Sequence, residues 1–202
     1  SLFIIFSFFP YYTNFITEKP PVFSKILQTR GMIQKRNSFR KGVIMLKLLF
    51  ITHSGSCRPP MAEFIMKSLI ARSGQDDKIY ASSAHLQKKK GEPIGQKERE
   101  LLTKKEIPYM EKICLPLTWS DYDRYDYIFL TDDEEKWPFL KIIGGDPKEK
   151  VRLLGEYAGI TGNIVNPEKT GQYEEACTAS LAACQGLFKK LLDRVAVKTE
   201  QS

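Results

Sequence analysis

The hydrophobic pattern of the chain becomes regular at Met45. Residues 46–52, LKLLFIT, form a nearly continuous apolar run, which is typical of a strand buried on both faces of a parallel sheet. A short polar loop follows, and Pro59 and Pro60 then suit the first turn of a helix, where a missing N–H has no cost. Apolar residues recur after them at i, i+3, i+4 and i+7: Ala62, Ile65, Met66 and Leu69. The pattern predicts a strand, a tight loop and a helix that ends at Gly74.

Strands and helices continue to alternate along the rest of the chain. Three further strands are predicted at 78–82, 125–131 and 151–154, and two helices at 96–105 and 132–141. The glycine- and proline-containing stretch 155–171 is predicted to be a long loop. A closing helix carries residues at alternating steps of four and three: Tyr173, Cys177, Leu181, Cys184, Phe188 and Leu191. This alternation predicts a compact three-layer α/β domain with a parallel sheet and right-handed crossovers.

The first 44 residues differ from the rest in composition. The apolar run 2–9, LFIIFSFF, is far shorter than the roughly 20 residues that cross a bilayer, and it lacks the order of a secretory signal. Residues 1–44 contain seven Lys/Arg and one acidic residue, so they supply +6 of the net charge of +7. We expect an N-terminal extension, disordered or non-native, before a domain at 45–195 and a tail at 196–202. The alternative is a membrane-surface role through the aromatic and basic side chains.

Composition excludes several classes of protein and of site. The 202 residues suit one domain, and 42% hydrophobic with 27% charged residues excludes disorder and a disulfide miniprotein. The near-neutral balance after residue 44 gives no reason to expect a nucleic-acid partner. Four cysteines without a C-x-x-C pair, with only His53 and His85 beside them, predict no metal site and no cofactor. Cys177 and Cys184 are predicted to share one buried helix face, and a reducing, cytoplasmic setting fits.

The loop after the first strand is the candidate binding site. Ligands of open α/β sheets bind beyond the carboxyl ends of the strands, and this loop leads into a helix N-terminus. Its backbone N–H groups, which can converge on one oxyanion, belong to His53, Ser54, Gly55, Ser56, Cys57 and Arg58. The Arg58 guanidinium offers a planar fork to two oxygens. The loop therefore predicts a phosphoryl ligand, with a structural turn and an ordinary surface arginine as the alternative. The lysine run 88–90 is predicted to be a solvated face, with contact to acidic or phosphorylated partners beside the binding site as the alternative.

The stretch from Met45 to about Val195 resembles the low molecular weight protein tyrosine phosphatase family. Where the family has a strand, C-x5-R-S-P and a helix, this chain has LLFIT, a loop through Cys57-Arg58, and Pro60-Met61-Ala62-Glu63-Phe64. Further matches follow in order: Ala81-Ser82-Ser83-Ala84, Gly91-Glu92-Pro93, Tyr125-Asp126-Tyr127-Ile128, Gly144-Gly145-Asp146-Pro147 and Val151-Arg152-Leu153-Leu154. The resemblance implies a four-stranded parallel sheet flanked by helices. It also implies phosphoryl transfer through a cysteinyl phosphate, with phosphorylated proteins or small phosphate esters as substrates.

Three positions depart from the chemistry that the resemblance implies. The nucleophilic cysteine of the family is Thr52 here, and an alcohol has no thiolate-like anion at neutral pH. The general acid of the late Asp-Pro pair is Asn166, whose amide cannot supply a proton, and general acid catalysis contributes about 10²- to 10⁴-fold in rate. The serine that holds the thiolate is Pro59. Glu168 and Lys169 replace the aromatic residues that flank the phosphotyrosine ring in the family.

Other loop positions have open interpretations. Ser54-Gly55 replaces the Gly-Asn pair of the family, and Ser56 stands where tyrosine-directed members have an aliphatic residue. Cys57 corresponds to a second loop cysteine, Asp132 to an aspartate that supports the active site, and His53 binds an oxyanion or covers the loop. We expect a phosphate- or phosphoprotein-binding protein that is catalytically impaired, a pseudophosphatase. The alternatives are an active phosphatase with slow or unusual chemistry and a structural remnant without a site.

Overall fold

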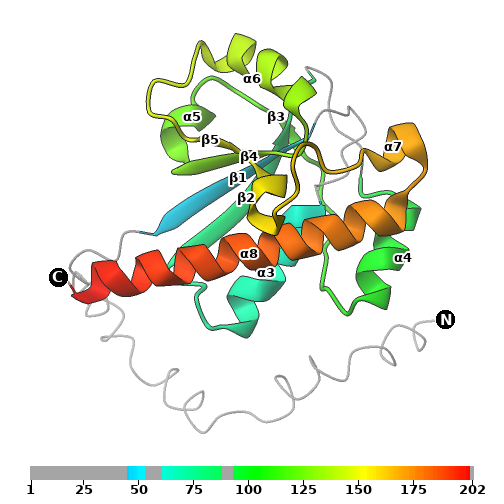
Figure 1. The fold of residues 1–202 in the computed structure, drawn as a ribbon, viewed down its shortest axis with the longest axis horizontal. Helices are drawn as coiled ribbons and strands as arrows, with labels where there is room; N and C mark the ends of the chain where they lie inside the picture. Colours follow the sequence, from blue (N-terminus) through cyan, green and yellow to red (C-terminus); the bar gives the residue numbers. More distant parts are fainter. Residues whose placement is uncertain (1–44, 53–60, 88–92, 201–202) are drawn as a thin grey trace, which may run out of the picture. The chain divides into compact units, whose positions relative to one another are not determined.

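The computed structural model describes residues 45–52, 61–87 and 93–200 (Figure 1). The predicted extension at 1–44 and the candidate loop at 53–58 lie outside these ranges, as does the lysine run 88–90. Five strands are β1 (Leu46–Thr52), β2 (Ile79–His85), β3 (Leu115–Pro116), β4 (Tyr127–Leu130) and β5 (Val151–Leu153). The α-helices are α3 (Met61–Arg72), α4 (Gln96–Lys104), α5 (Asp121–Arg124), α6 (Lys136–Ile143), α7 (Pro167–Thr170) and α8 (Tyr173–Glu200). The described residues also form the 3-10 helices η3 (Asp133–Glu135) and η4 (Leu154–Ala158).

The strands form one parallel sheet in the order β3-β2-β1-β4-β5. A parallel α/β fold is therefore confirmed, but the expected count of four strands is one short. The additional strand, β3, pairs with β2 through only two residues, Leu115 opposite Ala84 and Pro116 opposite His85. So short a strand, half of it proline, has no periodicity that a sequence reading can detect, and proline is tolerated there because β3 lies at the edge of the sheet.

Helices cover both faces of the sheet, as the hydrophobic pattern predicts. Leu48 and Phe50 of β1 point into one core, which α3 and α8 cover. The alternate residues Leu49 and Ile51 point into a second core, which includes Tyr122 of α5 and side chains of α6. In Figure 1 the sheet lies between α5 and α6 on one side and α3 and α8 on the other. The apolar run of β1 is thus buried on both faces, which is the property that identified it.

Some element boundaries differ from the prediction for local reasons. The predicted helix at 132–141 divides into η3 and α6, because Pro138 has no N–H to donate to the carbonyl of Glu134 and an α-helix cannot extend back past it. The predicted loop at 155–171 contains most of η4 and all of α7. The four-residue helix α5 was not predicted, since it is too short for a 3.6-residue period to show.

The closing helix packs as its spacing predicts. Cys177 and Cys184 are both fully buried free thiols on α8, so their assignment to one buried face is confirmed. The Cys184 thiol donates to the carbonyl of Ala62 at 3.6 Å, which ties α8 to the first turn of α3. Burial raises the pKa of Cys184 far above its ordinary value. Within the described residues, no helix is long and apolar enough to cross a membrane.

Candidate functional site

The carboxyl ends of β1, β2 and β4 lie at one edge of the sheet because the strands are parallel. Of the predicted site residues, Thr52, Asp132 and Asn166 belong to the described part of the chain. Thr52 is the last residue of β1, and Asp132 follows the end of β4 by two residues. The candidate loop follows β1 in the sequence, and the roles of its residues remain predictions: His53, Ser54, Gly55, Ser56, Cys57 and Arg58.

Thr52 has a neighbour that the sequence did not single out. It pairs in register with His85 of β2, and its carbonyl accepts a hydrogen bond from the N–H of Leu86 at 3.1 Å. Leu48, Phe50 and Thr52 alternate along β1, so Thr52 and His85 lie on the sheet face that α3 and α8 cover. Sequence reasoning weighed His85 only as a metal ligand, and its place at a strand end was the available signal.

The His85 imidazole is fully buried at the end of β2. Its exposed fraction is 0%, and neither ring nitrogen has a hydrogen-bond partner among the described residues. Burial lowers the pKa of His85, against a smaller opposing effect of the Gln87 backbone. The ring is therefore neutral at pH 7. A neutral imidazole can act as a general base, and His85 is paired in register with Thr52.

Asp132 stabilises the turn after β4. Its Oδ1 accepts a hydrogen bond from the N–H of Glu134 at 2.8 Å, and the buried Glu135 carboxylate accepts from the N–H groups of Thr131 and Asp132 at 2.8 and 3.3 Å. The two side chains form a capping box at η3. Burial raises the pKa of Glu135 to about 7, although the hydrogen bonds from Thr131 and Asp132 oppose this. In this structure Asp132 supports the backbone at the candidate site.

Asn166 caps the short helix α7. Its Oδ1 accepts from the N–H of Glu168 at 3.0 Å, and Pro167 occupies the first helical position. Asparagine and aspartate are equally good N-caps. The loop can therefore keep one shape with either residue, whereas only an aspartic acid could donate a proton. Asn166 is structurally competent and chemically inert as an acid.

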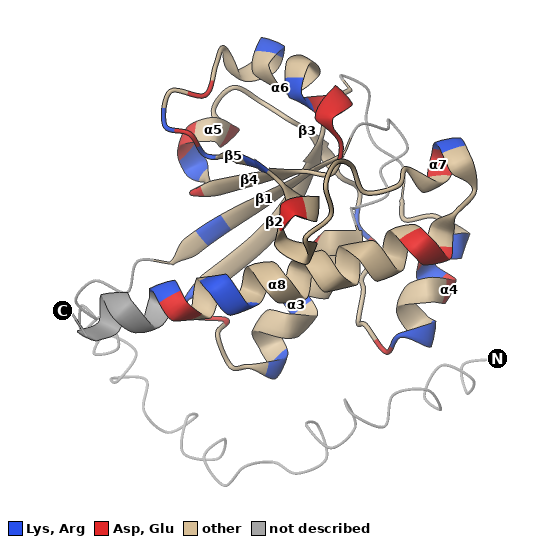
Figure 2. Ribbon diagram, viewed as in Figure 1, with Lys and Arg blue, Asp and Glu red and all other residues tan. Residues whose placement is uncertain are grey.

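The late loop is joined to the end of β4. The N–H of Ile164 donates to the carbonyl of Thr131 at 3.0 Å, and the N–H of Asp133 donates to Oδ1 of Asn163 at 2.8 Å. Lys169 of α7 forms an ion pair with Glu134 of η3 at 2.5 Å. In Figure 2 the segment before α6 is red and α7 carries both colours. These contacts bring the loop that contains Asn166 to the edge of the sheet at which β1 ends with Thr52. Glu168 and Lys169 are both exposed.

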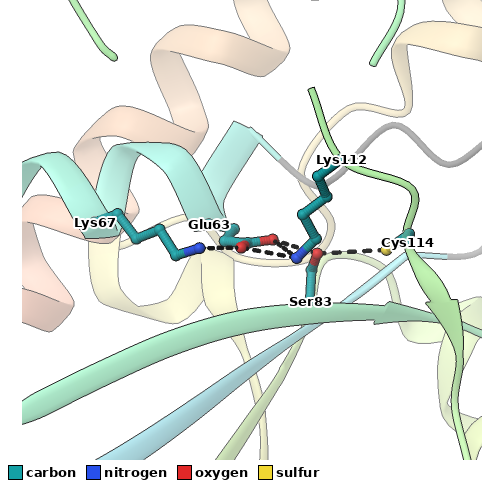
Figure 3. Close-up of polar contacts among 5 residues, drawn as sticks. All are labelled: Glu63, Lys67, Ser83, Lys112 and Cys114. Atoms are coloured by element: carbon teal, nitrogen blue, oxygen red, sulfur yellow. Dashed lines mark hydrogen bonds and ion pairs between the residues drawn. The ribbon is translucent and has the colours of Figure 1, made fainter. Parts of the chain in front are cut away.

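A buried carboxylate lies in the first turn of α3, directly after the candidate loop. Glu63 is fully buried, and its Oε1 accepts hydrogen bonds from Nζ of Lys67 at 2.6 Å and of Lys112 at 2.8 Å (Figure 3). Its Oε2 accepts from Nζ of Lys112 at 2.7 Å and from the hydroxyl of Ser83, which also lies 3.4 Å from the Cys114 thiol.

Ionisation of Glu63 depends on these partners. Burial alone raises the pKa of Glu63, but the charge of Lys112 and the hydrogen bonds from Lys112, Lys67 and Ser83 outweigh it and hold the pKa below its ordinary value. Glu63 was noted in the sequence only as part of a motif. Its ion pair with Lys112 joins residues 49 positions apart, which no local pattern reveals. Among the described residues, no group of His, Cys, Asp and Glu is arranged to hold a metal ion.

Comparisons with known proteins agree with this arrangement. Residues 47–198 match the family described as low molecular weight phosphotyrosine protein phosphatase. The chain is 27% identical to the low molecular weight protein-tyrosine-phosphatase YfkJ of Bacillus subtilis over 154 residues, which cover 73% of this chain and 96% of the relative. It is 27% identical to the low molecular weight protein-tyrosine-phosphatase PtpA of a Staphylococcus aureus strain over 149 residues, which cover 71% and 92%.

Solved structures show the same fold. The crystal structure of YfkJ from Bacillus subtilis superimposes with a TM-score of 0.69 at 27% identity, covering 74% of this chain and 96% of that one. A low molecular weight protein tyrosine phosphatase from Streptococcus pyogenes superimposes with a TM-score of 0.63 at 26% identity, covering 73% and 93%. Together with the match over three quarters of its length, these likenesses mean that the chain belongs to the low molecular weight phosphotyrosine protein phosphatase family.

Proposed function

We propose that this protein binds phosphate or phosphorylated proteins at the loop 53–58 and hydrolyses them poorly or not at all. Arg58 and the loop N–H groups would hold the phosphoryl oxygens, as family membership implies. Thr52 occupies the nucleophile position and Asn166 the general-acid position. We assign the protein to a reducing, cytoplasmic compartment because of its cysteine usage.

The observation that carries the proposal is the cap made by Asn166. The amide takes the N-cap position of α7 with a 3.0 Å hydrogen bond, and the loop around it is joined to the end of β4. The late loop thus keeps a capped, anchored shape with a residue that cannot donate a proton, which supports a binding rather than a hydrolytic role. At Thr52, an alkoxide is far less accessible than a thiolate, and a phosphothreonine would be a poorer leaving group in the second step. Both steps of turnover lose a required group.

Two measurements on the full chain test the proposal. Hydrolysis of an aryl phosphate is compared between the natural protein and a Thr52→Cys, Asn166→Asp variant, and tungstate is added during thermal unfolding. We expect turnover only in the double variant. We also expect stabilisation of the natural protein by about 2.7 kcal/mol at a hundred times the tungstate Kd. Arg58→Ala should abolish this stabilisation.

A slow phosphatase is a second candidate, favoured by the neutral His85 beside Thr52. It predicts phosphate release by the natural protein that Arg58→Ala removes. A structural remnant predicts neither turnover nor stabilisation by tungstate. If the double variant binds tungstate and also stays inactive, the altered cradle residues Pro59 and Ser54-Gly55 account for the loss.

A further inference from the structure

The cluster around Glu63 connects three separate segments beside the candidate site. Glu63 lies in the first turn of α3, Ser83 is on β2, and Lys112 precedes β3 (Figure 3). Lys67 contacts the same carboxylate but comes from the next turn of α3 itself. Of these three partners of Glu63, Lys112 and Ser83 are therefore the ones that connect α3 to other elements. Lys112 is largely enclosed, with 20% of its side chain exposed, whereas 40% of Lys67 is exposed.

The cluster contains more positive charge than is needed to neutralise Glu63. One carboxylate faces two ammonium groups, so the cluster carries a net charge of +1 at neutral pH. Desolvating two charges costs as much as their attraction returns in many proteins, so a buried pair is weak evidence for a purely stabilising role. Lys112 makes hydrogen bonds to both carboxylate oxygens. This bidentate contact fixes the orientation of the Glu63 side chain, and with it the turn of α3 from which that side chain comes.

We propose that Lys112 is a positioning residue for the anion site, which holds Glu63 against Ser83 and thereby sets the first turn of α3 relative to β2. This inference rests on the proposed function, because the N-terminal end of α3 follows the loop 53–58. Oxyanions bind to preorganised N–H groups, and a displacement of about 1 Å in such a group costs up to about a hundredfold in function. Loosening the link between α3 and β2 should therefore weaken anion binding in a protein that is still folded.

Lys67 supplies a matched control for Lys112. Lys67→Met and Lys112→Met each remove one positive charge from the same carboxylate, but only the second cuts a link between separate elements. Tungstate affinity of the full chain is measured by calorimetry at a temperature at which circular dichroism shows every variant folded. We expect Lys112→Met to raise the Kd about tenfold, Lys67→Met to raise it less than about threefold, and Lys112→Arg to stay near the parent value.

Each alternative result has a distinct meaning. Equal losses in Lys67→Met and Lys112→Met would overturn positioning in favour of net charge, and an unchanged Kd in Lys112→Met would reduce the pair to a structural one. If Lys112→Met fails to fold, the double variant Glu63→Gln, Lys112→Met removes the buried charge, and parental affinity in it overturns the inference. Absence of tungstate binding in the parent itself is a failure of the proposed function, and the inference falls with it.

Discussion

Gly186 of α8 lies directly against the backbone of Tyr157 in η4. A Cβ atom at Gly186 would lie 2.0 Å from the carbonyl oxygen of Tyr157 and 3.0 Å from its carbonyl carbon. The first distance is far shorter than non-bonded atoms tolerate, and the obstacle is backbone that cannot rotate away. The absence of a side chain at Gly186 therefore permits the close approach of α8 to η4.

Gly186→Ala should destabilise the fold although alanine is the better helix former. The added methyl group forces α8 away from η4, which costs about 3 kcal/mol in the free energy of unfolding, more than the helix propensity of about 1 kcal/mol returns. Urea unfolding followed by circular dichroism measures the change. Gln185→Ala, at the exposed neighbouring position, serves as the control and should leave the midpoint almost unchanged. A Gly186→Ala protein as stable as its parent would contradict the close contact.

Glu135 should make the protein less stable as the pH rises. Its pKa is raised from 4.5 to about 7 in the folded state, chiefly by burial, so the folded protein holds a proton that the unfolded chain has released. The associated stability is fully present below pH 4.5 and is lost as the pH rises through about 7. The displacement of 2.5 pKa units corresponds to about 3 kcal/mol.

Glu135→Gln isolates this effect. Glutamine keeps an acceptor for the N–H groups of Thr131 and Asp132 but does not titrate. Urea unfolding between pH 4.5 and 8 should show the natural protein losing stability relative to the variant as the pH rises. Parallel stability curves for the two proteins would refute a raised pKa at this site.

His85 should act in the opposite direction, by destabilising the fold in acid. Its pKa is lowered by burial, so the folded protein resists a proton that the unfolded chain accepts near its ordinary pKa of 6.5. The contribution of His85 to the free energy of unfolding is present above pH 6.5 and is lost as the pH falls towards the pKa of His85 in the folded state. His85→Leu should be as stable as the natural protein, or more stable, at pH 8, because it removes two buried nitrogens that have no hydrogen-bond partner among the described residues.

The pH dependence distinguishes this account from simple repacking. Thermal unfolding of the natural protein and of His85→Leu is compared at pH 8 and at about pH 5.5. The natural protein should lose more stability than the variant over that interval, while Glu135 contributes equally to both. An identical loss in the two proteins would show that the pKa of His85 is the same in the folded and the unfolded state.

The ion pair between Lys104 and Glu174 should contribute little to stability, in contrast to the pair that Lys112 forms. Its Nζ and Oε1 are 2.6 Å apart, but both side chains are more than half exposed, so solvent screens their attraction. Lys104→Ala should leave the urea midpoint within experimental error, whereas Lys112→Met should lower it clearly. A marked effect of Lys104→Ala would mean that the pair, which joins α4 to α8, bears more of the packing than its exposure indicates.

The order of the longer elements and the family of the chain followed from the sequence. The apolar run of β1 and the apolar spacing of α3 have local signatures, since a strand buried on both faces and an amphipathic helix each impose their own periodicity on neighbouring residues. The loss of catalytic groups at Thr52 and Asn166 was also predicted from residue types, because an alcohol and an amide have fixed proton affinities wherever they lie. That loss stays a prediction until turnover is measured.

Tertiary structure alone decided the remaining relationships. The strand β3 forms only because β2 offers an edge to two residues, and His85 is buried beside Thr52 only because the sheet pairs their strands. Lys112 meets Glu63 across 49 residues of sequence. Each of these depends on where distant segments converge, and a local pattern of polar and apolar residues contains no information about that, because burial and partner choice are settled by packing.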